Sequence, residues 1–215
     1  MSGSGPATAD ERRAQWAAAS PHNYDPRPKL ALEAGTSVLD ADGFWSAVTE
    51  LATSRNATAP VIVIDAYPGV DHDALRAEAA RRLPQFHIID VEQTAALPSE
   101  AIDTMLAPSL TSDRVFGRMS QFTVDEFYDP DKLATLRQAS AARTGPLLLI
   151  GWGADLAAPS ADVLVLADIA RWEIQLRQRA GQANWRCDNG GVDQLRKYKR
   201  SFFVEWRAAD RHKRT

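Results

Sequence analysis

The stretch at residues 61–83 constrains the fold of this chain more than any other. It opens with an apolar run at 61–64, β-branched throughout, which favours a strand buried on both faces of a parallel sheet. A turn at Pro68-Gly69 follows, and apolar residues then recur at helical spacing as far as Leu83. A strand, a glycine turn and a helix in this order are typical of a phosphate-binding loop.

Four further short apolar runs predict strands, at residues 86–90, 147–150, 163–167 and 202–207. Helical patterns lie before and between the strands, at 43–51, 99–106, 131–143 and 169–180, with a loop at 108–112. Strands that alternate with helices predict an α/β fold with a doubly wound, mostly parallel, five-stranded sheet. Sheets of this kind bind their ligands at the carboxyl ends of the strands.

The composition predicts one domain with an N-terminal extension. Residues 1–28 are rich in Ala, Ser, Pro and Gly, and we expect a flexible arm there, whereas residues 29–215 suit a single α/β domain. No apolar run approaches the ~18 residues of a membrane span and no signal peptide is visible, so we expect a cytoplasmic protein without a membrane partner. The single cysteine, Cys187, excludes an internal disulfide and fits a reducing compartment.

The charge balance argues against nucleic acid as a partner, because the net charge is −3. The tail at 196–214 is basic with interleaved aromatic residues, a pattern also found on nucleic-acid-binding surfaces. The strand predicted at 202–207 explains those aromatics instead as core or as a contact for a following domain. The four histidines lie far apart and none has an HxH or HExxH spacing, so no protein-held metal site is predicted.

Several segments resemble, in chain order, the uridine kinase-like branch of P-loop kinases. They are the strand–turn–helix unit, the strand that ends at Asp90, the segment GPLLLIG at 145–151, and DVLVLAD at 162–168, which runs into an arginine-rich helix. The resemblance covers residues 60–207. It implies a P-loop kinase-like fold.

The same resemblance implies residues that clamp phosphate. In that family the helix after the fourth strand carries lid arginines, and Arg171 and Arg179 occupy that place here, on one face of the predicted helix. Glu173 and Arg177 are four residues apart in the favourable order and are predicted to pair with each other. A solvated helix face is the alternative for the two lid-like arginines.

Three further residues match positions that lie near the acceptor substrate in that family. Asp90 stands where such kinases keep a general base or a metal-binding carboxylate, although an aspartate capping the next segment is the simpler interpretation. Arg114 and Arg118 lie where family members handle the acceptor substrate. Ordinary surface arginines are the alternative for this substrate-binding pair.

A closer likeness exists to the N-terminal region of a bacterial group of class I mannose-6-phosphate isomerases. It rests on the segments VIVIDAYPGVD, DRVFG, ADIARWEIQLRQR and KYKRSFFVEWRAADRHKR. In those longer proteins a kinase-like segment precedes a metal-binding cupin domain, which would begin here near Thr215. The resemblance implies a role in carbohydrate metabolism and a cupin isomerase domain as partner. The cupin Gln/His/Glu metal cluster has no counterpart here, so isomerase catalysis is assigned to no residue.

The loop departs from the phosphate-binding pattern GxxxxGK[ST]. Ala66 and Asp71 stand at the two glycine positions, His72 at the lysine and Asp73 at the hydroxyl. A helix N-terminus attracts anions, but Asp71 and Asp73 would use that field themselves, as N-cap and first-turn acid. We therefore predict a degenerate phosphate loop that does not bind ATP in the usual way, unless magnesium bridges these carboxylates to the phosphates.

Two functions are compatible with these residues. In the first, a degenerate, pseudo-kinase-like domain binds a phosphorylated small molecule or supports an isomerase domain, and no cofactor is assigned. In the second, an active nucleoside or sugar kinase uses ATP and magnesium through a non-standard loop, with Asp90 as base. The predicted phosphate-binding residues are Gly69, His72, Asp73, Arg171 and Arg179.

Overall fold

The computed structural model describes residues 31, 33, 35–36 and 38–213. The chain divides into two compact units, Met1–Leu39 and Asp40–Thr215, and the architecture below is that of the second. The arm predicted at 1–28 lies outside the described residues. Among the described residues, no helix combines the length and the apolar character needed to cross a membrane.

The second unit is built on a parallel sheet of four strands in the order β2-β3-β1-β4. Four predicted strands are confirmed by the structure, with bounds β1 (Val61–Ala66), β2 (His87–Asp90), β3 (Leu147–Gly151) and β4 (Val163–Ala167). Every residue of β1 and β3 is buried, as expected for β-branched and leucine-rich runs at the centre of a parallel sheet.

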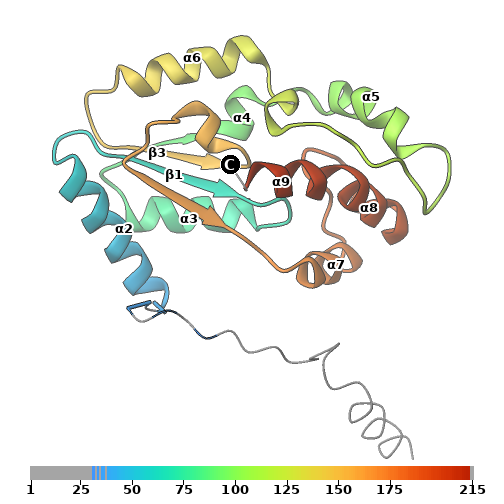
Figure 1. The fold of residues 1–215 in the computed structure, drawn as a ribbon, viewed down its shortest axis with the longest axis horizontal. Coiled ribbons are helices and arrows are strands. Elements are labelled where there is room, and N and C mark those ends of the chain that lie inside the picture. The colour runs from blue at the N-terminus through green and yellow to red at the C-terminus, as the bar shows by residue number, and fades with distance from the viewer. Residues whose placement is uncertain (1–30, 32, 34, 37, 214–215) are drawn as a thin grey trace, which may run out of the picture. The chain divides into compact units, whose positions relative to one another are not determined.

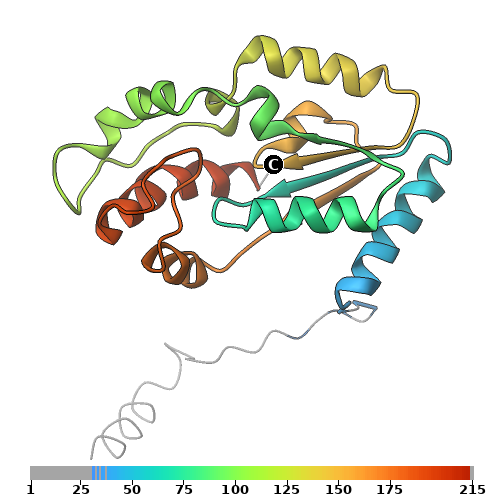
Figure 2. The same cartoon turned by 180° about the vertical axis from the view of Figure 1, so that it is seen from behind.

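Helices cover both faces of the sheet (Figures 1 and 2). One core packs α2 (Ala41–Arg55) and α3 (His72–Arg82) against Ile62 and Ile64 of β1. The other core packs against Val61 and Val63, on the opposite face of the same strand. It is formed mainly by α4 (Val91–Ala95), α5 (Ser99–Leu110), α6 (Pro130–Ala141) and the C-terminal α9 (Trp206–His212).

Aspartates fix where many of these helices begin. The side chains of five aspartates accept a hydrogen bond from a backbone N–H of the first turn, namely Asp40, Asp71, Asp90, Asp129 and Asp193. Such caps satisfy donors that the helix leaves unpaired and typically stabilise it by about 1 kcal/mol each. The helix α5 also runs through Pro108 to Leu110, so the loop predicted from residue 108 begins later.

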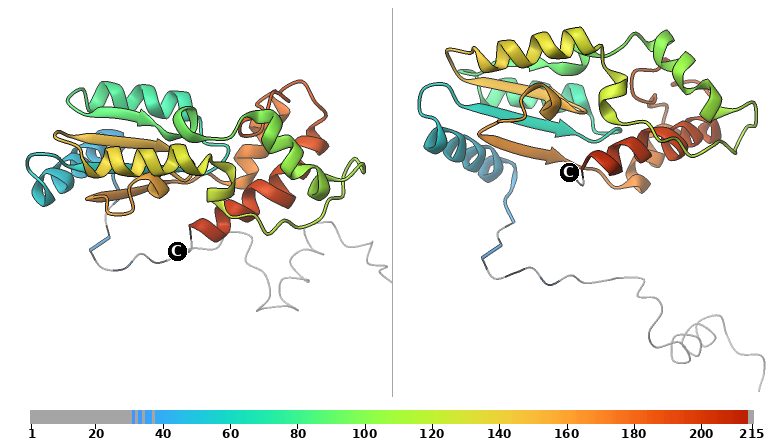
Figure 3. Two further views of the ribbon diagram at one scale, coloured as in Figure 1. Left: turned by 90° about the horizontal axis from the view of Figure 1, so that it is seen from above. Right: turned by 45° about the horizontal axis from the view of Figure 1, so that its top comes forward.

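The prediction of a fifth strand at 202–207 is wrong. This segment lies in a continuous helical run formed by α8 (Gln194–Arg200), the π-helix η3 (Ser201–Glu205) and α9 (Trp206–His212), which Figure 3 shows beside the carboxyl edge of the sheet. Val204 and Ala208 are both buried, at the spacing of one helical turn. A short apolar run does not distinguish strand from buried helix, and the alanines at 208–209 extend the helical pattern. Of the aromatic residues, Trp206 is core at 1% exposed, and Tyr198, Phe202 and Phe203 are partly buried against the same core.

Candidate functional site

The candidate site lies where the carboxyl ends of β1, β2 and β3 meet. After β1 the chain turns at Pro68-Gly69 into α3, and β2 ends at Asp90 and continues directly into α4. After β3 the chain passes through Trp152 and Gly153 into the short 3₁₀ helix η2 (Ala154–Ala157). Crevices at this edge are where open α/β sheets bind ligands.

The loop after β1 is fixed by close packing. Gly69 has a φ of +109°, and a Cβ at this position would lie 2.7 Å from a side-chain carbon of Ile174. Ile174 belongs to α7 (Arg171–Arg179), the helix that was predicted to act as a lid. Arg177 of the same helix donates to the Gly69 carbonyl at 3.4 Å. Only glycine fits here, because a side chain would meet both an unfavourable φ and the body of α7.

The N-terminus of α3 is capped by a carboxylate of the protein itself. The Asp71 side chain accepts a hydrogen bond from the Ala74 N–H at 3.0 Å, as the sequence predicted for an N-cap. Asp73 points to solvent with a side chain 86% exposed and lies 3.7 Å from the guanidinium of Arg76. The start of this helix therefore presents two carboxylates where a working phosphate loop presents backbone amides and a lysine.

His72 joins the loop to the end of β2. Its Nε2 lies 2.8 Å from Oδ2 of Asp90, and its Nδ1 lies 3.8 Å from Oε1 of Glu92. Asp90 also accepts the Gln93 N–H at 2.9 Å, so it caps α4 and holds His72 at the same time. The interpretation of Asp90 as a helix cap is thus confirmed, and its role as a general base or metal-binding carboxylate stays a prediction.

Glu92 is a member of the site that was not singled out from the sequence. It is buried, and Oε1 accepts the Trp152 N–H at 2.8 Å. Gly151, with a φ of +137°, leaves room for it, because a Cβ there would lie 2.8 Å from its Cγ. Burial raises the pKa of Glu92, against the opposing effect of His72. The Asp-x-Glu pattern at the end of β2 and the Gly-Trp-Gly segment after β3 were the available signals.

The pKa values of the central pair shift in opposite directions. The hydrogen bond to Asp90 raises the pKa of His72 above its usual range, with burial opposing and the charge of Glu92 adding to the increase. Burial favours the neutral form of Asp90, but the hydrogen bonds from His72 and from the Gln93 N–H outweigh it and lower the Asp90 pKa. The two groups form an imidazolium–carboxylate pair over a broad pH range.

This pair predicts a pH-dependent stability. His72 contributes fully to the free energy of unfolding below its ordinary pKa of about 6.5. This contribution is lost as the pH rises through the raised folded-state pKa of His72. The contribution of Asp90 is present above its ordinary pKa of 3.8 and is lost as the pH falls through its lowered folded-state pKa. We expect His72→Gln to lower the free energy of unfolding by about 1–3 kcal/mol near pH 5.5, and by less near pH 9.

Urea denaturation of both proteins at about pH 5.5 and 9 measures this difference. His87→Gln, which changes an exposed histidine of β2, is the matched control and should show no such pH dependence. An equal cost of His72→Gln at both pH values would contradict the ion pair.

The two lid-like arginines turn toward different neighbours. Arg171 forms an ion pair with Asp210 of α9 and lies over the ring of Trp206, 5.2 Å from its centroid. Arg179 lies 5.2 Å from the ring centroid of Trp172, on its own helix. Their phosphate-binding role stays a prediction. The Glu173–Arg177 pair predicted for this helix is confirmed, with a distance of 2.9 Å between Oε1 and Nε.

Arg114 and Arg118 lie on the long connection between α5 and η1 (Val124–Phe127). Arg114 pairs with Asp193, the residue that caps α8, and Arg118 is exposed. Neither position tests the predicted role in substrate binding.

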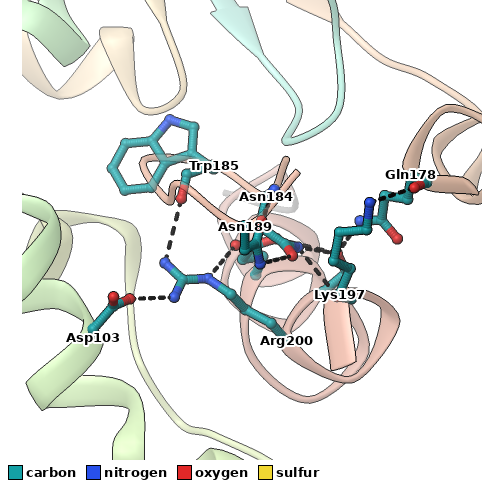
Figure 4. Close-up of polar contacts among 9 residues, drawn as sticks. Asp103, Gln178, Asn184, Trp185, Asn189, Lys197 and Arg200 are labelled. Carbon is teal, nitrogen blue, oxygen red and sulfur yellow. Dashed lines mark hydrogen bonds and ion pairs between the residues drawn. The ribbon is translucent and has the colours of Figure 1, made fainter. Parts of the chain in front are cut away.

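A buried polar network holds the connection between α7 and α8 in place (Figure 4). The Lys197 ammonium donates to the carbonyls of Gln178, Gln182 and Gly190, which closes the connection onto α8. The Arg200 guanidinium reaches the Trp185 carbonyl at 3.3 Å. Lys197 is 2% exposed, so this basic residue of the 196–214 tail does not belong to an exposed charged surface.

The network positions an aromatic side chain next to the site. The Trp185 indole packs edge-on against Trp152, with ring centroids 4.8 Å apart, and it also contacts Phe127. Trp152 is the residue whose backbone N–H binds Glu92. The α7–α8 connection thus closes the buried side of the His72–Asp90–Glu92 cluster.

A surface pocket of about 580 Å³ opens on the other side of Asp90. It lies along the edge strand β2, between α3 and the start of α4. Its polar side chains are one guanidinium, one imidazole, one carboxylate, one amide and one hydroxyl, from Arg76, His87, Asp90, Gln93 and Thr94.

Three comparisons with known proteins bear on this arrangement. Residues 43–215 match the model of a family described as a domain of unknown function, DUF8485. No curated protein matches the chain. Among solved structures, a "putative fructose transport system kinase" from Silicibacter sp. TM1040 is similar at 12% identity with a TM-score of 0.54, over 81% of this chain and 95% of that one. At this identity the likeness concerns the fold alone, and it supports the predicted kinase-like α/β architecture with a parallel sheet.

Proposed function

The chain belongs to the DUF8485 family of domains of unknown function, and we propose that it is a kinase-fold domain that binds a phosphorylated small molecule without the standard ATP chemistry. The observation that carries this proposal concerns the residue at the lysine position of the phosphate loop. His72 stands there, and it is held by Asp90 at 2.8 Å instead of reaching outward to a phosphate.

Electrostatics at the loop disfavours a nucleotide triphosphate. Asp71 already caps α3, and Asp73 adds a second carboxylate to the same helical turn. Two like unit charges at about 4 Å repel by roughly 4 kcal/mol at an effective dielectric constant near 20. Ordinary ATP binding at this position would therefore require a bridging cation to offset several such repulsions between the loop carboxylates and the phosphates.

The pocket beside Asp90 offers a better chemical match to a sugar phosphate. Arg76 lines it with a half-exposed side chain that can pair with a phosphate group. Asp90, Gln93 and Thr94 line the same space and offer hydrogen-bonding partners for hydroxyl groups. The sugar named in the description of the structural neighbour and the sequence likeness to mannose-6-phosphate isomerases point to the same ligand class. The support for an isomerase domain as partner is the sequence likeness alone.

An active small-molecule kinase is the second candidate, and the position of Asp90 favours it. This carboxylate lines the pocket where a hydroxyl acceptor would lie and can accept a hydrogen bond from that hydroxyl. Phosphate transfer from ATP to a panel of nucleosides and sugars tests this candidate. Turnover no faster than that of the His72→Ala, Asp90→Ala double variant would end it.

Ligand-induced stabilisation tests the main proposal. We expect hexose phosphates to raise the melting temperature of the protein, and ATP with magnesium to leave it unchanged, because only a bound ligand shifts the folding equilibrium. Arg76→Ala should weaken hexose phosphate binding by about 10- to 100-fold, the equivalent of losing a charged hydrogen bond of roughly 1.5–3 kcal/mol. Isothermal calorimetry measures the loss.

Arg81→Ala is the matched control. Arg81 lies on the same helix, is 61% exposed and pairs with Glu78, so its removal should leave binding intact. A magnesium-dependent stabilisation by ATP that disappears in Asp73→Ala would overturn the proposal. Equal binding of hexose phosphate by Arg76→Ala and Arg81→Ala would contradict the assignment of the ligand to the pocket beside Asp90.

A further inference from the structure

Three potential metal ligands come together at a second place on the carboxyl edge of the sheet, apart from the site described above. Asp65 is the penultimate residue of β1, Asp155 lies in η2, and His212 is the last residue of α9. Their ligand atoms all lie within 4.8 Å of one another. Figure 1 shows the end of α9 beside the carboxyl ends of β1 and β3, which explains how such distant residues meet.

Asp65 is the buried member of this cluster. Its side chain is 9% exposed, and Oδ1 accepts the Gly153 N–H at 2.5 Å. Its other oxygen, Oδ2, points at the His212 Nε2 from 3.6 Å, beyond hydrogen-bonding distance. One oxygen is thus held by the backbone while the other faces the centre of the cluster, as in carboxylates whose orientation is fixed for a metal by an outer hydrogen bond.

The other two members approach the same point. Nε2 of His212 lies 2.7 Å from Oδ1 of Asp155, so an imidazole nitrogen and two carboxylate oxygens face one another. Atoms bonded to one ion at about 2.0–2.2 Å are separated by roughly 3–4 Å, so the cluster needs only small side-chain movements to bind an ion. Three protein ligands leave further positions for water or a substrate oxygen.

The charges of the cluster are compatible with a cation. Two of its three side chains are carboxylates, and Asp65 is the buried one. A divalent ion would compensate both carboxylates at once, and it would displace any proton from the imidazole nitrogen that binds it, as metal ligation requires.

From this geometry we infer that Asp65, Asp155 and His212 bind a divalent first-row transition ion such as Zn²⁺ or Mn²⁺. Mixed carboxylate and imidazole ligands suit these ions better than Mg²⁺ or Ca²⁺, which prefer oxygen ligands alone. This inference does not depend on the proposed sugar phosphate pocket, which uses different residues.

The fold sets the positions of all three ligands. Gly153 has a φ of +72°, and a Cβ there would lie 2.5 Å from Val124, so this turn delivers Asp155 and the N–H that holds Asp65. The π-helix η3 sets the rotation with which α9 presents His212. The three ligands thus belong to a strand, a 3₁₀ helix and an α-helix, which favours a preorganised site.

The test uses the full chain and the bare ions. Equilibrium dialysis with Zn²⁺ and with Mn²⁺ should show one tightly bound equivalent, and the Asp155→Asn and His212→Gln variants should bind at least about tenfold more weakly. Glu100→Gln changes an exposed acid of α5 and is the matched control. Circular dichroism establishes that each variant is folded.

A spectroscopic readout identifies the histidine directly. Electron spin-echo modulation of bound Mn²⁺ should show coupling to a ¹⁴N nucleus that persists in His72→Gln and disappears in His212→Gln. Absence of stoichiometric uptake of either ion by the unmodified chain would overturn the inference. So would binding that is equal in His212→Gln, or a ¹⁴N signal that instead disappears in His72→Gln.

Discussion

Replacing Arg200 by methionine should lower the free energy of unfolding by about 3–5 kcal/mol, which is a large part of the ~5–15 kcal/mol typical of a domain. The Arg200 guanidinium lies 2.9 Å from the Glu205 carboxylate, and their side chains are 6% and 2% exposed. Methionine fills much of the same volume but leaves Glu205 as a buried charge, whose remaining hydrogen-bond partners in the described part of the chain, Asn184 and Ser201, are neutral. Chemical denaturation followed by circular dichroism measures the loss.

Two further variants separate this charge effect from a loss of packing. Arg196→Met changes an exposed arginine one turn earlier on α8 and should change stability by less than about 0.5 kcal/mol. Adding Glu205→Gln to Arg200→Met removes the uncompensated charge and should restore part of the stability. A double variant less stable than Arg200→Met alone would contradict the assignment of the loss to the buried charge.

Trp152→Ala should cost about 3–5 kcal/mol, the amount typical of a large aromatic residue removed from a core. Trp152 is 1% exposed and packs against Trp185 and Phe127. The substitution keeps the backbone N–H that binds Glu92, so the hydrogen bond can persist while the cavity remains. Urea denaturation measures the stability, and near-ultraviolet circular dichroism should show that the environment of the remaining tryptophans has changed.

A second tryptophan provides the matched control. Trp172 is 60% exposed on α7 and packs against Arg179, so Trp172→Ala should cost no more than about 1 kcal/mol. Similar losses for both alanine variants would mean that Trp152 is not the central residue of the aromatic cluster.

The parts of the fold that the sequence predicts are those with a strong local pattern. The apolar runs of β1, β2, β3 and β4 each form the strand that was expected. The run at 202–207 has the same local character, but its neighbours on both sides are helical and its apolar residues pack at helical spacing. Local pattern cannot decide such a case, because tertiary packing selects between strand and helix.

The candidate site likewise contains residues that the local sequence pattern predicts and one that only the structure adds. Asp71 as a helix cap and His72 at the lysine position follow from the spacing of the loop, and the structure adds which carboxylate holds the histidine. Glu92 enters through a hydrogen bond from Trp152, 60 residues further along the chain. Contacts over such separations depend on strand order and helix packing, which a single sequence does not reveal.

The π-helix at Ser201–Glu205 accommodates one extra residue in the C-terminal helical run. A π-turn contains one residue more than an α-turn, so deleting one residue here would yield a regular helix and leave the residues beyond it at nearly the same rotation. Deleting one residue from the regular helix α8 instead would rotate everything beyond it by about 100°. Trp206 would then leave the core and His212 would turn away from Asp65. The helical run can therefore lose one residue at the π-helix, whereas α8 sets the rotation on which both the packing and the histidine position depend.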